Sequence, residues 1–244
     1  MMRNRVGHRF TFPTETEAER LRNISRVDFF SGLSADKLAQ VASISHAIHR
    51  PRGAIIFMVG DPADLFYVTG VGRVKISLLS CYGKELIVEI VEPGGIFGEL
   101  VLIDDSPHVT VAEALDDVLL YGYWKQNFKN IIASHPELAL RLAKIVGSRF
   151  RKIERKVSDL VNKDVSARIT DLLVELAGTR GDNGDSTGEI LVRLKQQDVA
   201  GLIGACRQAT TKALNDLERM GWIELGRGSI RIKSLHGLRG QQQE

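Results

Sequence analysis

The stretch QQDVAGLIGACRQATTKALNDLERMGW, residues 196–222, decides the fold of the C-terminal part of the chain. Small and apolar side chains recur at helical spacing in QQDVAGLI and again in RQATTKALNDLERMGW, and Gly204 separates the two segments. A glycine between two short amphipathic helices permits the sharp turn of a helix-turn-helix. We expect the inner faces of the two helices to carry Ala200, Ile203, Ala209, Ala213, Leu214 and Leu217.

The residues after this stretch predict a β-hairpin, and they belong to a basic region. WIEL and SIRIKSL flank Gly226, Arg227 and Gly228, so that the pattern is a winged helix-turn-helix. From Ile190 to Gly240 there are nine Lys and Arg against four Asp and Glu, a net charge of +5 in a chain whose total is +3. The remainder therefore sums to −2. A local basic excess favours contact with the phosphates of double-stranded DNA, whereas the alternative is an ordinary solvated helix face.

Polar side chains near the start of the second helix are the candidate DNA contacts. That end of the helix enters the major groove in helix-turn-helix proteins. Arg can bond to guanine O6 and N7, and Gln to adenine N6 and N7, so we expect Arg207 and Gln208 to read bases. Further contacts to bases or backbone are expected from Thr211, Lys212, Gln196 and Arg227.

Toward the N-terminus, glycines punctuate a β-rich region. Gly60, Gly72, Gly83 and Gly94 are spaced 12, 11 and 11 residues apart, between the runs AIIFMV, LFYVTG, RVKISLL and ELIVEIV. Short strands with a turn signal every 8–12 residues predict an all-β sandwich or barrel, which HVTVAEA and VLLYGYW extend to Trp124. Before it, FFSGLSADKLAQVASI predicts an amphipathic helix capped by Ser34.

After Trp124 the apolar period changes to about 3.6, which predicts a long helix over residues 126–163. A long apolar seam interrupted by one arginine favours pairing of two helices across a dimer axis, although packing on its own domain is the alternative. The seam residues are Leu138, Leu142, Ile145, Arg149, Ile153, Val157 and Leu160.

A further helix, SARITDLLVELAG, is expected to be capped by Asp164 and to end at Gly178. The polar segment GTRGDNGDSTG follows. It lacks the Lys-Ser or Lys-Thr of a phosphate loop, so we interpret it as a connector.

These pieces, in this order, resemble the CRP/FNR family of bacterial transcription regulators from about residue 25 to residue 238. The matching motifs are FFSGLS, PRGAIIFMVGDPADLFYVTGVGRVKI, IFGELVLIDD and QQDVAGLIGACRQATTKALNDLERMGWI. The resemblance implies an α+β fold with an N-terminal double-stranded β-helix or jelly-roll (cyclic-nucleotide-binding-like) domain over 20–125. A dimerisation helix over 126–163 and a winged helix-turn-helix over 164–240 would follow.

The resemblance also implies a function, a homodimeric DNA-binding regulator that reads a near-palindromic site and has RNA polymerase as a partner. Arg207, Gln208 and Lys212 fall at the family's base-reading positions. The cyclic AMP receptor branch has Glu at the position of Gln208, so we expect an altered half-site that Gln208→Glu would change. Cys206 precedes this helix where relatives often have Ser, and a thiol caps poorly. A redox role for Cys206 stays open, although buried inert thiols are commoner.

The effector site departs from the nucleotide-binding members of the family. Gly98, Glu99 and Leu100 are kept, but the Arg-Ser pair that holds the cyclic phosphate reads His108 and Val109, followed by Thr110. The positions that contact the base read Ile153 and Glu154. Three or four lost polar contacts, at about 1–3 kcal/mol each, argue against ordinary cyclic AMP control. The alternatives are a cyclic-nucleotide-responsive regulator and a nucleotide-binding signalling module that does not act on DNA.

The sequence gives no sign of an iron–sulfur cluster, a haem or metal site, a membrane span or a signal peptide. Two cysteines, Cys81 and Cys206, are too few for an iron–sulfur cluster. No haem or metal is expected, because the histidines of the N-terminal half show no ligand spacing; these are His8, His46, His49, His108 and His135. The longest uncharged run, Leu38 to His49, is too short to cross a membrane, and the N-terminus lacks the apolar core of a signal peptide. We expect a cytoplasmic protein, and the catalytic motifs of common enzymes are absent.

Overall fold

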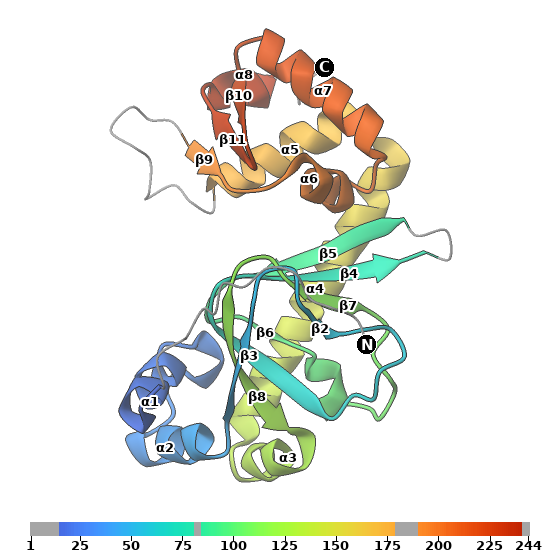
Figure 1. Cartoon of the computed structure of the whole chain (residues 1–244). Coiled ribbons are helices and arrows are strands. Elements are labelled where there is room, and N and C mark those ends of the chain that lie inside the picture. Colours follow the sequence, from blue (N-terminus) through green and yellow to red (C-terminus); the bar gives the residue numbers. More distant parts are fainter. Residues whose placement is uncertain (1–14, 81–83, 179–189, 241–244) are drawn as a thin grey trace, which may run out of the picture. The chain divides into compact units, whose positions relative to one another are not determined.

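The computed structural model describes residues 15–80, 84–178 and 190–240, and the chain divides into two compact units (Figure 1). The first unit comprises residues 1–76 and 90–147, and the second comprises residues 77–89 and 148–244. His8, Cys81 and all but the first residue of the predicted connector lie outside the described residues.

Two α-helices and a short 3-10 helix come first in the described part of the first unit. These are α1 (Glu17–Ser25), η1 (Asp28–Phe30) and α2 (Ala35–Ser43). Thr16 caps α1: its hydroxyl accepts the Glu19 N–H, while the Glu19 carboxylate accepts the Thr16 N–H at 2.8 Å. Such a reciprocal arrangement satisfies two backbone donors that a helix start leaves open. Ser34 precedes α2 as predicted, but its side chain makes no capping hydrogen bond.

Two four-stranded sheets form the predicted β-roll. One sheet has the order β1-β8-β3-β6, formed by His46–Arg50, Val118–Trp124, Leu65–Val71 and Ile96–Phe97. The other has the order β2-β7-β4-β5, formed by Ile55–Phe57, Val111–Ala114, Val74–Leu79 and Glu85–Val91. Strand β8 pairs antiparallel with both β1 and β3, and it is buried over residues 118–123. The all-β prediction for this region is confirmed.

Aromatic side chains fill much of the core of the first unit. Phe66 packs edge-on against Phe128 with ring centroids 4.4 Å apart, and stacks on Tyr123 at 4.9 Å. Nearer the second sheet, Tyr67 stacks on Phe97 at 5.0 Å. Burial of such rings is the main favourable term in folding, and offset or edge-on pairs add to it.

The region predicted as one helix over 126–163 is two helices, α3 (Lys125–Ser134) and α4 (Pro136–Asn162). His135 has φ −138°, which is not helical, and proline is well suited to open a new helix at its first position. The N-terminal part of α4 belongs to the first unit. There Leu138 is 0% exposed and Leu142 is buried in the same core, against which Ile145 packs.

The second unit holds the remaining helices and a three-stranded sheet. The helices are α5 (Val165–Gly178), α6 (Gln196–Ile203), α7 (Arg207–Arg219) and α8 (Leu235–Gly240). The sheet has the order β10-β11-β9, formed by Ile223–Gly226, Ser229–Ile232 and Ile190–Val192. Asp164 caps α5 as predicted, since its carboxylate accepts the Ala167 N–H at 2.8 Å. Helix α5 contacts β9 and α7 contacts β10, whereas α6 packs against α5 and α7 (Figure 1).

A hairpin made from the ends of β4 and β5 also belongs to the second unit, and charged groups attach it to α4. The Glu89 carboxylate lies 2.6 Å from Arg149 Nε and 3.1 Å from Lys152 Nζ. Lys156 Nζ donates to the Ile87 carbonyl oxygen at 2.5 Å, and burial lowers the pKa of this ammonium group. Arg149 therefore forms an ion pair with Glu89 inside the second unit.

Among the residues that the structure describes, no helix is long and apolar enough to cross a membrane.

Candidate nucleic-acid interface

The turn between α6 and α7 depends on one glycine. Gly204 follows α6 with φ +63°, a left-handed conformation that glycine adopts without strain. Its N–H and that of Ala205 bond back to the carbonyls of Gly201 and Ala200 at 3.3 and 3.0 Å. The helix-turn-helix predicted at this glycine is confirmed.

Helix α7 has one buried face and one open face. Thr210, Leu214 and Leu217 face the core of the unit. The opposite side lines a hollow of about 640 Å³, formed by Arg207, Gln208, Thr211, Lys212 and Asn215. All of these except Thr211 are exposed. Asn215 was not predicted, although positions 208, 211, 212 and 215 follow helical spacing and so provided the signal.

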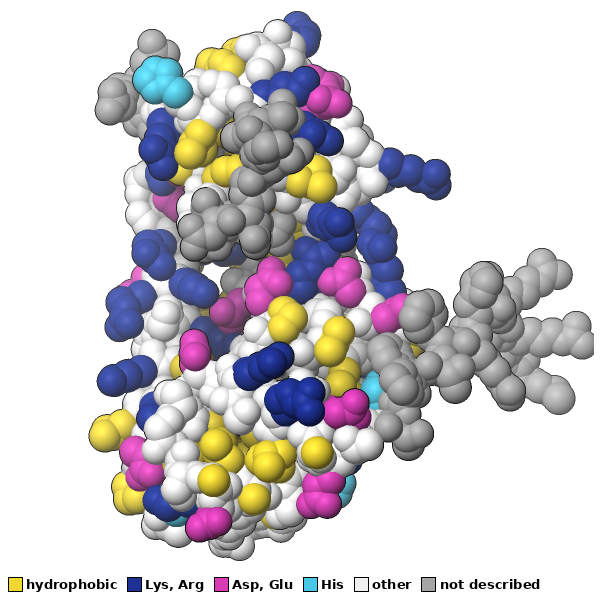
Figure 2. Space-filling model, turned by 90° about the vertical axis from the view of Figure 1, so that its left-hand side faces the viewer, with side chains coloured by type: hydrophobic (Ala, Val, Ile, Leu, Met, Phe, Trp, Pro, Cys, Tyr) yellow, Lys and Arg dark blue, Asp and Glu magenta, His cyan; other side chains and the backbone are white. Residues whose placement is uncertain are grey.

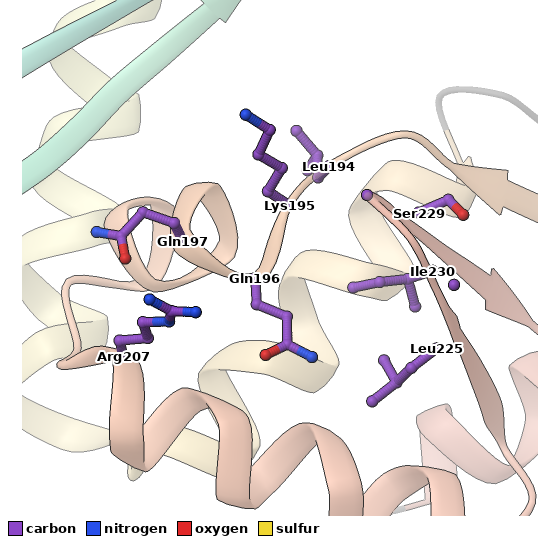
Figure 3. A pocket seen from close by; sticks show the side chains of 10 residues that line it. Leu194, Lys195, Gln196, Gln197, Arg207, Leu225, Ser229 and Ile230 are labelled. Atoms are coloured by element: carbon purple, nitrogen blue, oxygen red, sulfur yellow. The ribbon is translucent and has the colours of Figure 1, made fainter.

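A second hollow, of about 400 Å³, lies between the starts of α6 and α7 and the wing (Figure 3). Figure 3 shows Gln196 extending toward α7 and Arg207 rising from the first turn of α7 beside Gln197. Lys195 points away from α7. The lining residues are Leu194, Lys195, Gln196, Gln197, Arg207, Leu225, Gly226, Gly228, Ser229 and Ile230. Two cationic and two amide residues, Lys195, Arg207, Gln196 and Gln197, thus line the same hollow.

One hydrogen bond connects the two helices across these hollows. Thr211 Oγ1 donates to Gln196 Oε1 at 3.0 Å, and both side chains are part-buried. The two residues are fifteen positions apart, so no helical or strand period relates them. Sequence reasoning placed both among the DNA contacts but did not identify their contact with each other.

The wing is a tight hairpin. Gly226 pairs with Ser229, and the two residues between them are Arg227, which is exposed, and Gly228, which has φ +76°. Glu224 and Lys233 form an ion pair at 2.7 Å across its strands, and the hydrogen bond from Lys233 lowers the pKa of the Glu224 carboxyl. Because Arg227 is one of the two residues that connect the strands, it lies at the tip of the wing.

Positive charge is concentrated on the second unit. On the face drawn in Figure 2, Lys and Arg side chains gather over this unit, whereas the first unit shows fewer of them among hydrophobic and acidic side chains. The start of α7 adds to this field, because a helix N-terminus carries partial positive charge. Cys206 stands at that start, exposed rather than buried, and its thiol makes no capping hydrogen bond.

The candidate effector residues fall into two groups, one in the first unit and one in the second. Gly98, with φ +71°, precedes the 3-10 turn η2 (Glu99–Leu102), in which Glu99 is buried and Leu100 exposed. His108 stacks on Phe57 with ring centroids 3.7 Å apart, and a Cβ at Gly98 would lie 3.6 Å from the same phenyl ring. The structure thus brings Gly98 and His108 to one ring.

His108 and the remaining effector positions provide few groups that could bind an anion. Burial lowers the pKa of His108 against the opposing effect of Asp61, and so favours the neutral form of its imidazole at pH 7. Val109 is 60% exposed, and Thr110 is half-buried. Ile153 and Glu154 belong to the second unit, where both are exposed. Within the described ranges, no group of three or more His, Cys, Asp or Glu side chains could hold a metal ion.

The predicted dimer seam requires a correction in its first half. Leu138 and Leu142 are buried in the first unit's own core, Ile145 packs against that core, and Arg149 pairs with Glu89. The apolar side chains that α4 exposes in the second unit are Phe150, Ile153, Val157, Leu160 and Val161.

Comparison with known proteins matches both halves of the chain. A family model described as cyclic nucleotide-binding domain matches residues 47–135, and one described as Crp-like helix-turn-helix domain matches residues 167–240. A CRP-like cAMP-activated global transcriptional regulator of Mycobacterium tuberculosis is 29% identical over 215 residues, covering 88% of this chain and 96% of the relative.

Two solved structures of regulators share the fold of this chain. A c-di-GMP-responsive global regulator of Xanthomonas campestris superposes with a TM-score of 0.75 at 20% identity, covering 82% of this chain and all of that one. A CRP/FNR-family transcriptional regulator of Thermus thermophilus superposes at 0.68 with 26% identity, covering 82% of this chain and 99% of that chain.

Proposed function

The chain belongs to the CRP/FNR family of DNA-binding transcription regulators, and on that premise we propose that it is a homodimer that reads a near-palindromic site through α7. The observation that carries the proposal is the open face of α7, where Arg207, Gln208 and Lys212 are exposed and line one hollow. With 13 residues α7 is about 20 Å long, a length and width that the major groove admits.

Each side chain has a chemical role in this reading. Arg207 and Gln208, in the first turn of α7, read base edges: the guanidinium pairs with guanine, and the exposed amide of Gln208 pairs with adenine. Lys212 and Arg227 contact bases or phosphates from the second turn and from the wing tip. The local excess of positive charge supplies the affinity that does not depend on sequence.

Dimerisation is supported by the exposed stripe on α4. Phe150, Ile153, Val157 and Leu160 follow one another at intervals of three, four and three residues, which is the spacing of a coiled-coil seam. An apolar helix face with this spacing can pair with the identical face of a second copy, so a second copy of the chain is the proposed partner. Two recognition helices about 34 Å apart would then reach successive major grooves.

We propose that ordinary cyclic AMP does not control this regulator. A cyclic phosphate needs a fixed positive charge or several donors, whereas the cassette offers a neutral imidazole stacked on Phe57 and an exposed valine. The name of the Mycobacterium tuberculosis relative, which describes it as cAMP-activated, supports the second candidate, a cyclic-nucleotide-responsive regulator.

The remaining proposals follow from the same assignment. The protein acts in the cytoplasm, where it binds double-stranded DNA and contacts RNA polymerase. It catalyses no reaction and needs no haem or metal. Its similarity to transcription regulators supports this assignment.

Selection of the purified full-length protein on a random duplex library, with and without cyclic AMP, tests the proposal. We expect a palindrome to be enriched without nucleotide, and titration with cyclic AMP to show no micromolar binding until His108→Arg and Val109→Ser are introduced together. Enrichment only with cyclic AMP would favour the second candidate. Enrichment of nothing under either condition would overturn the DNA-reading assignment.

A further inference from the structure

We propose that Gln196, from α6, is a specificity-determining residue whose amide is held by Thr211 of α7 so that it presents hydrogen-bond donors to the DNA. The inference rests on the proposed function and adds a base contact from outside α7. It also assigns Thr211 a different task from its neighbours, because Thr211 positions Gln196 instead of reading DNA itself.

The geometry places Gln196 among the DNA-facing groups. Thr211 follows Arg207 by four residues, so the two lie on one face of α7, and both line the same hollow. Gln196 lines the second hollow together with Arg207 and the wing. In Figure 3 the Gln196 side chain extends from the start of α6 toward α7, which is where Thr211 holds it at 3.0 Å.

The hydrogen bond fixes which end of the Gln196 amide points toward Thr211. The Thr211 hydroxyl donates to Gln196 Oε1, so the amide oxygen is directed toward α7 with one of its two lone pairs used, and the two N–H donors of Nε2 remain for a ligand. Reading adenine with glutamine requires the amide oxygen to accept from N6 while the nitrogen donates to N7. Thr211 competes for that oxygen. An amide that presents mainly its N–H donors instead suits guanine, which presents N7 and O6 as acceptors, or thymine, which presents O4.

Gln196 and Gln208 are therefore predicted to read different bases although they are the same residue type. Gln208 is exposed on the first turn of α7 and has both ends of its amide available for adenine. Gln196 has one end occupied by Thr211 and is expected to favour guanine or thymine.

Three variants test this assignment: Thr211→Val, Thr211→Ser and Gln196→Ala. Thr211→Val removes the hydroxyl but keeps the branched shape, whereas Thr211→Ser keeps the hydroxyl and is the matched control. The affinity of each is measured by fluorescence anisotropy for duplexes that carry each of the four bases at every half-site position of the selected sequence. Urea unfolding of each variant checks that the fold is retained.

Wild type and Thr211→Ser are expected to prefer guanine or thymine at one position by about tenfold, the discrimination of a good base contact. Gln196→Ala should lose that preference, and Thr211→Val should shift it toward adenine, while the positions read by Arg207 and Gln208 stay unchanged. Equal weakening of all duplexes by Gln196→Ala would show a phosphate contact and overturn the inference. An unchanged preference in Thr211→Val would overturn it as well.

The outcome for wild type separates this inference from the proposed function. A wild-type protein that selects a palindrome, with unaltered preferences in Gln196→Ala, contradicts only the role of Gln196. A wild-type protein that prefers no sequence contradicts the proposed function itself, and the inference with it.

Discussion

Ile87 of β5 packs against Gly201 of α6 so closely that a Cβ at Gly201 would lie 2.8 Å from Ile87 Cγ1 and 2.9 Å from Cδ1. Both residues are buried within the second unit. Leu86 makes a similar approach one helical turn later, 3.2 Å from a Cβ at Gly204. The first helix of the helix-turn-helix is therefore packed against the hairpin through two glycines, one of which also makes the turn.

Gly201→Ala is expected to lower the free energy of unfolding by about 1–2 kcal/mol. Overpacking a buried site costs about 1–3 kcal/mol, and the better helix propensity of alanine returns at most about 1 kcal/mol. Urea unfolding measures the change. Gly178→Ala is the control, because nothing lies within 4 Å of a Cβ there, and it should be neutral or stabilising. Equal stabilities of the two variants would contradict the close packing, and adding Ile87→Ala to Gly201→Ala should cost less than the two changes do separately.

The local features of the helix-turn-helix were predictable because each is a short-range signal. Gly204 adopts the left-handed conformation that its place between two amphipathic segments indicated, and Asp164 caps α5 as its position suggested. The evenly spaced glycines indicated the strands of the β-roll for the same reason. The hydrogen bond between Thr211 and Gln196 joins residues fifteen positions apart on two helices, so it depends on how the helices pack and could not be predicted from spacing.

The seam of α4 shows why periodicity alone assigns the wrong partner. Leu138 and Val157 belong to one apolar series in the sequence, yet Leu138 is buried in the first unit while Val157 is exposed in the second. Spacing identifies an apolar helix face but not what covers it. In addition, an apolar stripe drifts by about 20° per heptad around a straight helix, so the two ends of a 27-residue helix can face different surroundings.

Val157→Glu is expected to convert the proposed dimer to a monomer. It places a charge at the middle of the exposed stripe, where a second helix would leave the carboxylate buried and unpaired. Sedimentation velocity across a concentration series measures the change. Arg155→Glu is the matched control, since Arg155 is exposed and lies on the opposite side of α4, and it should leave the dimer intact. A Val157→Glu variant that still sediments as a dimer would argue against this stripe as the interface.

The stacked His108 should make stability depend on pH. Burial lowers the pKa of His108 in the folded protein, with nearby Asp61 opposing this effect, whereas the unfolded chain has the ordinary value of about 6.5. The unfolded state therefore binds the proton more readily, and the free energy of unfolding should fall as the pH drops below about 6.5. His108→Phe keeps a ring on Phe57 but cannot be protonated, so its stability should fall less between pH 7.5 and 5.5. Identical slopes in urea unfolding would show that His108 contributes nothing to the pH dependence.

Arg207→Ala should reduce affinity for the selected site by about 1–3 kcal/mol and relax the base preference at one position, because a guanidinium at the start of α7 can fork onto one guanine. The measurement is competition between the selected duplex and random DNA at fixed salt, since phosphate contacts make all such affinities salt-dependent. Arg219→Ala is the matched control: it removes the same charge from the far end of α7, where Arg219 is exposed and paired with Asp216. Arg219→Ala should change both affinities little. If Arg207→Ala weakened specific and random binding by the same factor, Arg207 would be a phosphate contact, and base reading would have to be assigned to Gln208 and the residues that follow it on the open face of α7.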